Sequence, residues 1–593
     1  MKKITIFSLL FSFTVVLNAA NYFVNGSVSA SGDGNSWATA FKTIDEAIAA
    51  ASNQDVIYIA AGEYTKAGEI SIAKVLTLKG GYLGNEDINN AIPDPMANKA
   101  KIRCNATGHA INLTVISDPG IPSAKHVFDG LYFYNTNAGG TGFGGALYLN
   151  AYFNNIDIKN CIFEQNKAGK GGAVYINSTS AASSNVLVDN CKFYENGSTG
   201  TTNASSWGGG AIYGTGNATG PKVVNLTIQN SEFIENYTYP EGGAIYLREY
   251  INLTTNNVLF RGNKAINSTV TPNAVGGAIY FYRKNTVSLS NTQLYGNTSG
   301  NKGNLFFNVA SAGSNNISAS VSNVVIAGNY AGNNGQSNIH VNNYDATTIT
   351  FANSIIANNT QNSGSNPLNK DFNNGTATAN LNNNYTLTNT ILGGVKTASS
   401  TVGAIMSTFT NTDYFTQAKI KISDATTALD SALVFVNTSE SVSIPHADLL
   451  GASVMIKIKD GANAYSVRAV SGTTAAVEVV VNVSGTYTLS VPSGFRLVDN
   501  ADQPVTSLTS AGTYQLTLKA DPTSVYPPRP AANSPFIVHN KLYNLKSGDI
   551  VSVYNIQGVR IMNRIADNAT MELPVGVLNI VKVQSGNNIM VIR

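Results

Sequence analysis

The chain has 593 residues, of which 43% are hydrophobic and only 12% charged, with 54 Gly, 75 Asn, 28 Tyr and 3 Cys. The hydrophobic fraction excludes a wholly disordered chain, and 37 basic against 34 acidic residues give no indication of a nucleic-acid partner. Three cysteines in so long a chain exclude a disulfide scaffold and a paired-cysteine zinc site. The excess of Gly, Asn and Tyr is typical of a β protein built from turns and stacked strands.

Residues 1–20 have the three-part pattern of a bacterial secretory signal peptide. Two lysines precede the apolar run Ile4 to Leu17, and small residues follow at Ala19 and Ala20. The run is shorter than the roughly 20 residues that a membrane-spanning helix needs. We therefore expect export, an extracellular or outer-membrane surface location, and no transmembrane helix.

The segment 37–52 predicts a helix at the start of the mature chain, with Ser36 as its N-cap. Four apolar residues fall on one helical face: Phe41, Ile44, Ile48 and Ala51. An open coil of strands exposes unpaired edges, so we expect this helix to cover the N-terminal end of the fold.

Two phrases repeat between residues 144 and 359. The first is Gly-Gly-Ala-apolar-Tyr, and its initial glycines stand at 144, 171, 209, 242 and 276. The second is Asn-x-x-apolar-x-x-Asn, with central residues Phe163, Phe193, Phe233, Phe260, Leu294, Ile326 and Ile356. The initial glycines are 27 to 38 residues apart. Internal repeats of this length, made of strand and turn residues without a helical period, indicate a solenoid.

One coil per repeat makes equivalent strands neighbours in a parallel sheet, and crossovers between parallel strands are nearly always right-handed. The predicted fold is therefore all-β: a right-handed parallel β-helix with an N-terminal capping helix, followed by small C-terminal β-sandwich modules. The central apolar residues should stack inside. The flanking asparagines should form tight corners and hydrogen-bonded columns, because Asn tolerates left-handed backbone geometry.

The segments Asp33 to Trp37, Val56 to Gly62 and Leu78 to Tyr82 resemble the opening of pectin-lyase-like right-handed β-helix proteins. The two alternating phrases are similar to polymorphic outer-membrane protein repeats. This resemblance implies the architecture for about two thirds of the chain. It leaves function open, because the fold hosts lyases, hydrolases, adhesins and surface proteins.

The repeats fade after Leu392, and we expect the β-helix to occupy 21–395. Residues 396–450 are predicted to be an irregular end of the solenoid, 451–525 a small β domain, and 526–539 a Pro-rich linker.

Residues 540–593 are expected to form a separate C-terminal domain. The runs Gly548 to Gly558 and Met571 to Gly576 resemble the C-terminal sorting domain of type IX secretion, which addresses cargo across the outer membrane. The alternative is a final β module that docks on its neighbour.

The candidate catalytic residues are Glu195, Glu235 and Arg248. The two glutamates share a column in adjacent repeats, and a lyase of this fold would need carboxylates that hold Ca²⁺ together with a basic residue. The alternative is that they are solvated corner carboxylates. No metal site is predicted from His109, His126, His340, His446 or His539, and no cofactor is expected unless a lyase binds Ca²⁺. Cys161 and Cys191 share a column but are expected to be free, buried thiols.

The tyrosines that end the first phrase are the candidate binding residues: Tyr148, Tyr175, Tyr213, Tyr246 and Tyr280. Strand alternation puts them on the side opposite the aliphatic residues, as an outward aromatic stripe suited to sugar rings or a partner. The alternative is a structural ladder covered by loops. We expect a monomeric bacterial surface protein, an adhesin or glycan-binding protein whose partner is a polysaccharide, a host or cell-surface glycan, or a protein. The alternative is a polysaccharide lyase or glycoside hydrolase.

Overall fold

The computed structural model describes most of the chain between residues 19 and 592. The described ranges are 19–114, 124–151, 155–178, 183–200, 207–216, 223–239, 241–268, 274–309, 317–332, 338–342, 348–357, 359–361, 372–373, 385–392, 395–401, 416–423, 428–438, 443–445, 454–460, 464–471, 474–481, 484–491, 495–520, 536–538, 541–543, 545–554, 560–567, 570–572, 580–585 and 588–592. Nearly all of the predicted signal peptide and most of the predicted Pro-rich linker lie outside them, as do His446 and His539.

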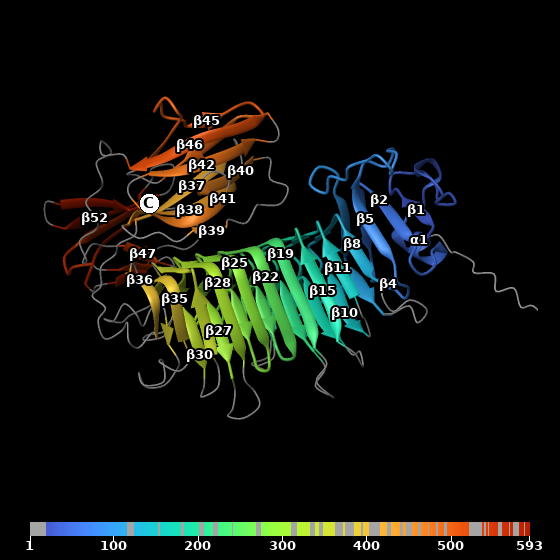
Figure 1. The fold of residues 1–593 in the computed structure, drawn as a ribbon, viewed down its shortest axis with the longest axis horizontal. Coiled ribbons are helices and arrows are strands. Elements are labelled where there is room, and N and C mark those ends of the chain that lie inside the picture. The colour runs from blue at the N-terminus through green and yellow to red at the C-terminus, as the bar shows by residue number, and fades with distance from the viewer. Residues whose placement is uncertain are drawn as a thin grey trace, which may run out of the picture. The chain divides into compact units, whose positions relative to one another are not determined.

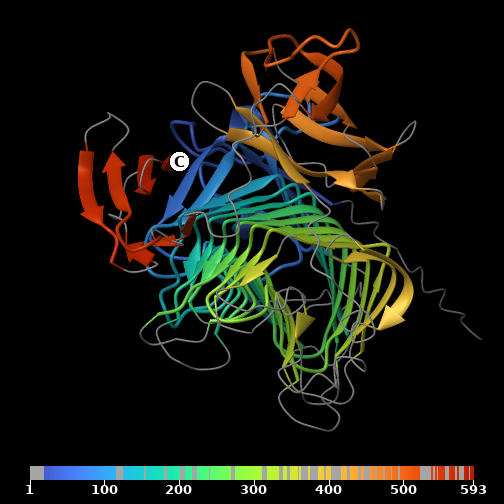
Figure 2. The same cartoon turned by 90° about the vertical axis from the view of Figure 1, so that its left-hand side faces the viewer.

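Three parallel sheets form a β-helix, which confirms the predicted fold class (Figures 1 and 2). Sheet A contains β1 (Asn21–Val24), β2 (Val56–Ala60), β3 (Gly62–Lys66), β5 (Thr77–Tyr82), β6 (Ala100–Cys104), β8 (His126–Asp129), β9 (Leu131–Tyr134), β11 (Asn155–Lys159), β12 (Ile162–Glu164), β15 (Ser184–Asp189), β16 (Lys192–Tyr194), β19 (Val224–Ile234), β22 (Ile251–Arg261), β25 (Thr286–Tyr295), β28 (Ser318–Ala327), β31 (Thr348–Ala352), β32 (Ile355–Ala357), β35 (Tyr385–Leu392) and the antiparallel β36 (Val395–Thr401).

Sheet B and, from Lys167 onward, sheet C complete the coils. Sheet B contains β4 (Ile70–Ile72), β7 (Ile111–Leu113), β10 (Leu147–Ala151), β14 (Val174–Ser178), β18 (Ile212–Thr215), β21 (Ile245–Leu247), β24 (Ile279–Phe281), β27 (Leu305–Asn308), β30 (Ile339–Asn342) and β34 (Phe372–Asn373). Sheet C contains β13 (Lys167–Ala168), β17 (Gly197–Ser198), β20 (Tyr237–Thr238), β23 (Lys264–Ala265), β26 (Thr298–Ser299), β29 (Tyr330–Ala331) and β33 (Thr360–Gln361).

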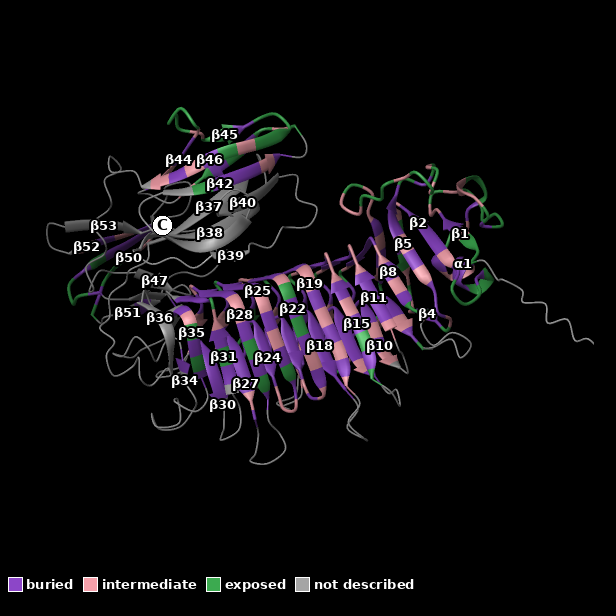
Figure 3. Ribbon diagram, viewed as in Figure 1, coloured by how far each residue is buried: buried purple, intermediate pink, exposed green. Residues whose placement is uncertain are grey.

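The central residues of the second phrase stack inside the coil, as predicted. Phe163, Phe193 and Phe233 are directly opposite one another in the strand register, and all three are closed to solvent. Their neighbouring ring centroids are 4.6 Å apart and the planes differ by 2° to 3°. Buried and more exposed positions alternate along β15 and along the part of β19 before its corner asparagine (Figure 3).

The two asparagines of the phrase have different roles. The first has a positive φ, between 47° and 57°, in every repeat from Asn160 to Asn353, which confirms the left-handed corner. The second forms a buried column in which each side-chain amide donates to the next side-chain carbonyl at 2.9 to 3.0 Å. We call this column the inner asparagine ladder: Asn166, Asn196, Asn236, Asn263, Asn297, Asn329 and Asn359.

The N-terminal helix is shorter than predicted. Residues 37–39 form a 3-10 turn, η1 (Trp37–Thr39), capped by Ser36, and the α-helix α1 (Ile44–Ala50) begins after Thr43. Thr43 and Glu46 make a complete capping box, which is a stronger helix start than Ser36. Phe41 instead exchanges backbone hydrogen bonds with Phe23 and Asn25. Ile44, Ala47 and Ile48 pack on the core at the N-terminal end of the β-helix (Figure 1).

The prediction that residues 396–450 are irregular is wrong for their described part. β36 pairs with β35, and β37 (Thr416–Ser423) pairs with β38 (Ala428–Thr438) and with β43 (Tyr487–Ser490) of the following segment. Alternating residues such as Lys419-Ile420-Lys421-Ile422 favour these strands. The sheet also contains β39 (Ser443–Pro445), β40 (Val454–Asp460), β41 (Ala464–Ser471), β42 (Thr474–Val481), β43 (Tyr487–Ser490), β44 (Phe495–Val498), β45 (Ser507–Leu508) and β46 (Gly512–Ala520).

The chain divides into two compact units, residues 1–491 with 497–519, and residues 492–496 with 520–593. The second unit contains two small antiparallel sheets around buried residues such as Val551, Val553 and Val581. Their strands are β47 (Phe536–Val538), β48 (Lys541–Tyr543) and β51 (Thr570–Glu572), and β49 (Ile550–Tyr554), β50 (Arg560–Ile565), β52 (Ile580–Ser585) and β53 (Asn588–Ile592).

Candidate functional site

The five candidate tyrosines form one stacked column on sheet B. They are paired in register from β10 to β24, and successive ring centroids are 4.8 to 5.6 Å apart. Histidine and phenylalanine rings extend the stack at both ends, with centroid distances of 4.4 to 5.3 Å. We call the whole column the aromatic ladder: His109, Tyr148, Tyr175, Tyr213, Tyr246, Tyr280, Phe306 and His340.

The ladder lies outside the apolar core but is not open to solvent. Ile212 and its equivalents pack in the main core, and the tyrosines form a separate cluster, as the strand alternation predicts. However, Tyr213, Tyr246 and Tyr280 are only 1%, 0% and 0% exposed and Tyr175 only 8%, so an exposed stripe is wrong for these four. Other side chains form a second layer over them, and burial raises the pKa of Tyr175 to about 12.

The residues that precede each Gly-Gly pair build part of this second layer. Isolated bridges align Phe143, Lys170, Gly208, Glu241 and Val275 in one column alongside the ladder. The second glycine of the pair is needed for close approach of the coils: a Cβ on Gly243 would lie 1.9 Å from the carbonyl oxygen of Gly277. The residue directly before each Gly-Gly pair therefore forms part of the layer that covers the tyrosines.

Lys170 is the central residue of the layer. Its ammonium nitrogen lies 4.9 Å from the ring centroid of Trp207 and 5.4 Å from those of Phe143 and Tyr213. These are cation–π distances. Burial, and then the charge of Arg248, lowers the pKa of Lys170. Among the described residues Lys170 has no carboxylate within ion-pair distance, so its charge is available to an anionic group.

Glu241 is a half-buried carboxyl in the same layer. Burial raises its pKa to about 8, although hydrogen bonds with Tyr280 and Tyr246 partly oppose the shift. Its Oε2 is shielded from solvent and has no hydrogen-bond partner among the described residues. Glu241 is therefore largely protonated near neutral pH.

Replacing Glu241 with Gln tests this protonation. Because the folded-state pKa lies above the ordinary value of 4.5, wild-type stability should fall as the pH rises from about 4.5 to about 8. We expect Glu241→Gln to unfold about 2 °C or more above wild type at pH 9, and at the same temperature at pH 5. Thermal unfolding at both pH values measures this. The exposed Glu235→Gln is the control, and an equal pH dependence of wild type and Glu241→Gln would contradict the assignment.

Arg248 closes another part of the layer. It interacts with the Tyr213 hydroxyl, and its Nε lies 3.6 Å from an oxygen of Glu249. Glu249 is buried and also binds Arg283 at 3.1 Å. The Glu249 carboxylate thus lies within ion-pair distance of two guanidinium groups, those of Arg248 and Arg283. These three residues therefore carry a net positive charge at this edge of the ladder.

The N-terminal part of the ladder is the most accessible part. Phe143, Tyr148 and Trp207 are half-buried, and the Phe143 and Trp207 rings are stacked at 6.1 Å and 13°. Asn150 donates a hydrogen bond to the Tyr148 hydroxyl at 2.6 Å, which holds an amide beside the ring. We call this surface the aromatic–basic patch: Phe143, Tyr148, Lys170, Trp207 and Arg248.

The structure does not bring the three candidate catalytic residues together in one site. Glu195 and Glu235 are exposed and stand at left-handed corners between sheets A and C, with φ of 50° and 55°. Gln165 donates to Glu195 at 2.8 Å, and a Cβ on Gly262 would lie 3.2 Å from Glu235. Arg248 follows β21 of sheet B and interacts with Tyr213 and Glu249. The described geometry therefore matches the solvated-corner alternative for the two glutamates.

The thiols and imidazoles offer no assembled metal site in the described part of the chain. Cys104, Cys161 and Cys191 are free and buried, which confirms the prediction for the last two. No group of three His, Cys, Asp or Glu residues with metal-binding geometry occurs among the described residues. His126 and His340 are buried, but neither belongs to such a group.

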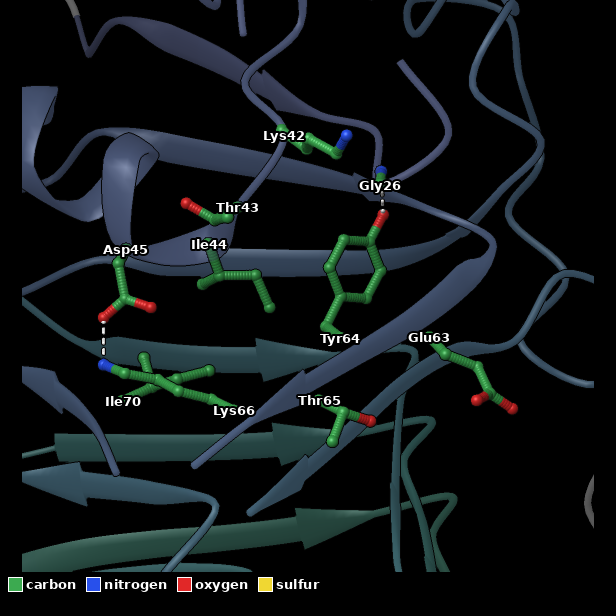
Figure 4. A pocket seen from close by; sticks show the side chains of 10 residues that line it. All are labelled: Gly26, Lys42, Thr43, Ile44, Asp45, Glu63, Tyr64, Thr65, Lys66 and Ile70. Atoms are coloured by element: carbon green, nitrogen blue, oxygen red, sulfur yellow. Dashed lines mark hydrogen bonds and ion pairs between the residues drawn. The ribbon is translucent and has the colours of Figure 1, made fainter. Parts of the chain in front are cut away.

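A cavity of about 460 Å³ lies beside α1 (Figure 4). Its charged groups are engaged within the chain: Lys66 binds Asp45 at 2.6 Å, and Glu63 binds Lys101 at 3.1 Å. The Tyr64 hydroxyl donates to the Ala60 carbonyl at 2.9 Å. The lining residues are Gly26, Lys42, Thr43, Ile44, Asp45, Glu63, Tyr64, Thr65, Lys66 and Ile70. This pairing gives the cavity no specific ligand chemistry.

Sequence reasoning missed Trp207 and Phe143 as site residues. Trp207 stands two residues before a Gly-Gly pair and Phe143 directly before one. The residue type at these positions varies, whereas the Gly-Gly-Ala phrase that follows is constant. This contrast is the sequence feature that could have identified them as site residues.

Comparisons with known proteins give a family match to one short region and a similarity to a distant solved structure. A family model described as the Chlamydia polymorphic membrane protein (Chlamydia_PMP) repeat matches residues 160–177. No curated protein matches the chain. A solved structure titled "Geobacillus virus E2 - ORF18" is similar at 12% identity with a TM-score of 0.31, over 92% of this chain and 86% of that chain, which is too low to support an argument. In the described residues, no helix is long and apolar enough to cross a membrane. The matched repeat points to a surface or outer-membrane protein.

Proposed function

We propose that the protein is an exported bacterial surface protein that binds an acidic glycan at the aromatic–basic patch. The observation that carries the proposal is the Lys170 ammonium among the rings of Phe143, Trp207 and Tyr213, without an ion-pair partner among the described residues. Half-exposed aromatic rings can stack on sugar rings, and cations bind the carboxylate or sulfate of an acidic sugar. The buried tyrosines would then support the patch from beneath rather than touch the ligand.

Export and display complete the proposal. The leader at 1–20 would direct the chain out of the cytoplasm, and residues 540–593 would act as a type IX sorting domain. The polymorphic membrane protein repeat supports a surface location. The β-helix would act as a monomer that holds the patch at a fixed position on a rigid scaffold.

The double variant Trp207→Ala with Lys170→Ala tests the site. We expect it to bind uronate-containing or sulfated oligosaccharides at least tenfold more weakly than wild type, because it loses a stacking face and the charge. Calorimetric titration of the full mature chain measures the change. Tyr239→Ala, which removes an exposed tyrosine outside the patch, is the control.

Undiminished affinity in the double variant, or no acidic glycan bound by wild type, would refute the proposed site. The same incubations, followed for unsaturated products or new reducing ends with and without Ca²⁺, test the lyase or hydrolase alternative.

A further inference from the structure

In each coil, the strand segment of sheet A before the corner asparagine has an outward-facing side. The charge of the side chains on this side changes along the β-helix. Its early coils carry charges, including Asp157, Lys159 and Asp189. From β19 to β35 the described outward positions carry no charge. Their side chains are small or polar and are exposed or half-buried, and every residue between two of them within a strand is buried.

Strand register assembles these positions into three columns, of which two run over six coils and the third over four. Every member except Ala352 carries a hydroxyl or an amide. We call this surface the hydroxyl–amide face: Asn225, Thr227, Gln229, Asn252, Thr254, Asn256, Thr286, Ser288, Ser290, Ser318, Ser320, Ser322, Thr350, Ala352, Thr386 and Thr388.

The face retains hydrogen-bonding capacity beyond its internal bonds. Asn252 donates to Asn225 at 3.0 Å, which uses one of the two amide hydrogens of Asn252 and one lone pair of Asn225. The hydroxyls of Thr254, Ser288 and Ser320 can each donate and accept. Since the face has neither charges nor aromatic rings, its ligand must be neutral and must bind through hydroxyl or amide groups.

The dimensions of the face favour a narrow polymer. Six coils at about 4.8 Å span about 24 Å along the axis, and three columns two residues apart span about 13 Å across. The resulting area of about 310 Å² is well below the roughly 800 Å² that each partner contributes to a stable protein–protein interface. A single extended polymer chain, in contrast, could contact the face along the whole length of these coils.

We infer that the hydroxyl–amide face binds a neutral polysaccharide lying along the helix axis. An extended β-linked glycan advances by nearly one coil spacing per sugar, so each sugar meets an equivalent row of side chains. Ice is a second periodic hydroxyl lattice, but the Asn256 side chain is longer than those of Ser288 and Ser320 and makes the face uneven. Sugar hydroxyls at different heights can match this relief, whereas a flat crystal plane cannot.

Affinity at this face depends on ligand length. Each row contributes a weak contact, and linking the contacts in one chain makes all but the first intramolecular. Monosaccharides and disaccharides therefore bind much more weakly than a chain that covers all six rows. This inference is independent of the aromatic–basic patch, which lies on sheet B and requires an acidic ligand.

The test is retention of the full mature chain on insoluble cellulose and chitin, with competition by soluble oligosaccharides of increasing length. The variant Thr254→Val, Ser288→Ala, Ser320→Ala removes three hydroxyls with little change of volume, and retention should fall at least tenfold. The matched control Thr65→Val, Ser71→Ala, Thr488→Val changes exposed hydroxyls elsewhere and should retain wild-type binding. Trp207→Ala with Lys170→Ala should also retain it.

Three results would overturn the inference. Wild-type retention of the hydroxyl variant would remove the face from the binding surface. Failure of wild type to bind either polymer would exclude this ligand class. Inhibition of ice growth by wild type, lost in the hydroxyl variant and without polysaccharide retention, would assign the face to ice instead.

Discussion

Replacing Asn236 with alanine is expected to destabilise the β-helix by roughly 3 kcal/mol or more, since several buried groups lose their partners at once. The Asn236 amide donates to Asn263 at 3.0 Å and to the Phe193 carbonyl at 2.9 Å. Its side-chain oxygen accepts from the backbone and the side chain of Asn196, at 3.0 and 2.9 Å. Alanine supplies none of these four contacts, and water has no access to replace them.

Asn225→Ala provides the control for the same chemical change. Asn225 also belongs to a hydrogen-bonded asparagine column, but on the solvent side, where water can replace its bonds. We expect this variant to lose less than about 0.5 kcal/mol. Hydrogen exchange of the strand amides measures the loss of stability locally, around the substituted coil. Equal protection in the two variants would contradict the importance of the inner asparagine ladder.

Replacing Phe193 with alanine is expected to cost about 3 to 5 kcal/mol, the range for a large aromatic removed from a packed core. Phe193 is closed to solvent and stacks between Phe163 and Phe233, each at 4.6 Å. The backbone on both sides is fixed by sheet pairing, so the neighbouring coils cannot collapse into the space. Thermal unfolding followed by far-ultraviolet circular dichroism should show a lower midpoint.

Phe193→Leu separates packing from ring stacking. Leucine restores most of the volume, and we expect a loss of about 1.5 kcal/mol or less. Phe143→Ala, at a half-buried ring, should also cost less than Phe193→Ala. A loss in Phe193→Leu as large as that in Phe193→Ala would mean that stacking, rather than filled volume, dominates the column.

The β-helix could be predicted from the sequence because its repeating unit is local and strict. Each coil places one apolar residue, one corner asparagine and one ladder asparagine at fixed offsets, and stacking then follows from geometry. The register of Phe163, Phe193 and Phe233 is the direct result. The same logic placed the tyrosines on the side of sheet B away from the core.

The covering of the tyrosines could not be predicted in the same way. Lys170, Trp207 and Glu241 belong to connections of different lengths, where no repeating offset fixes the direction of a side chain. Arg248 was singled out with Glu195 and Glu235, yet its neighbour is Tyr213, because a corner separates the columns. The start of α1 was misplaced because two plausible caps, Ser36 and Thr43, stand seven residues apart.

The common register of β15, β19 and β22 has a consequence for how such a chain changes length. Asn190, Asn230 and Asn257 occupy equivalent corners. A gene that lost the codons for residues 230–256 would place Asn257 where Asn230 had been, with Phe260 and Asn263 in the positions of Phe233 and Asn236. The corner, the aromatic column and the inner asparagine ladder would each remain continuous, and the β-helix would shorten by one coil of about 4.8 Å. Unequal recombination between repeats can therefore lengthen or shorten this scaffold without a new folding solution.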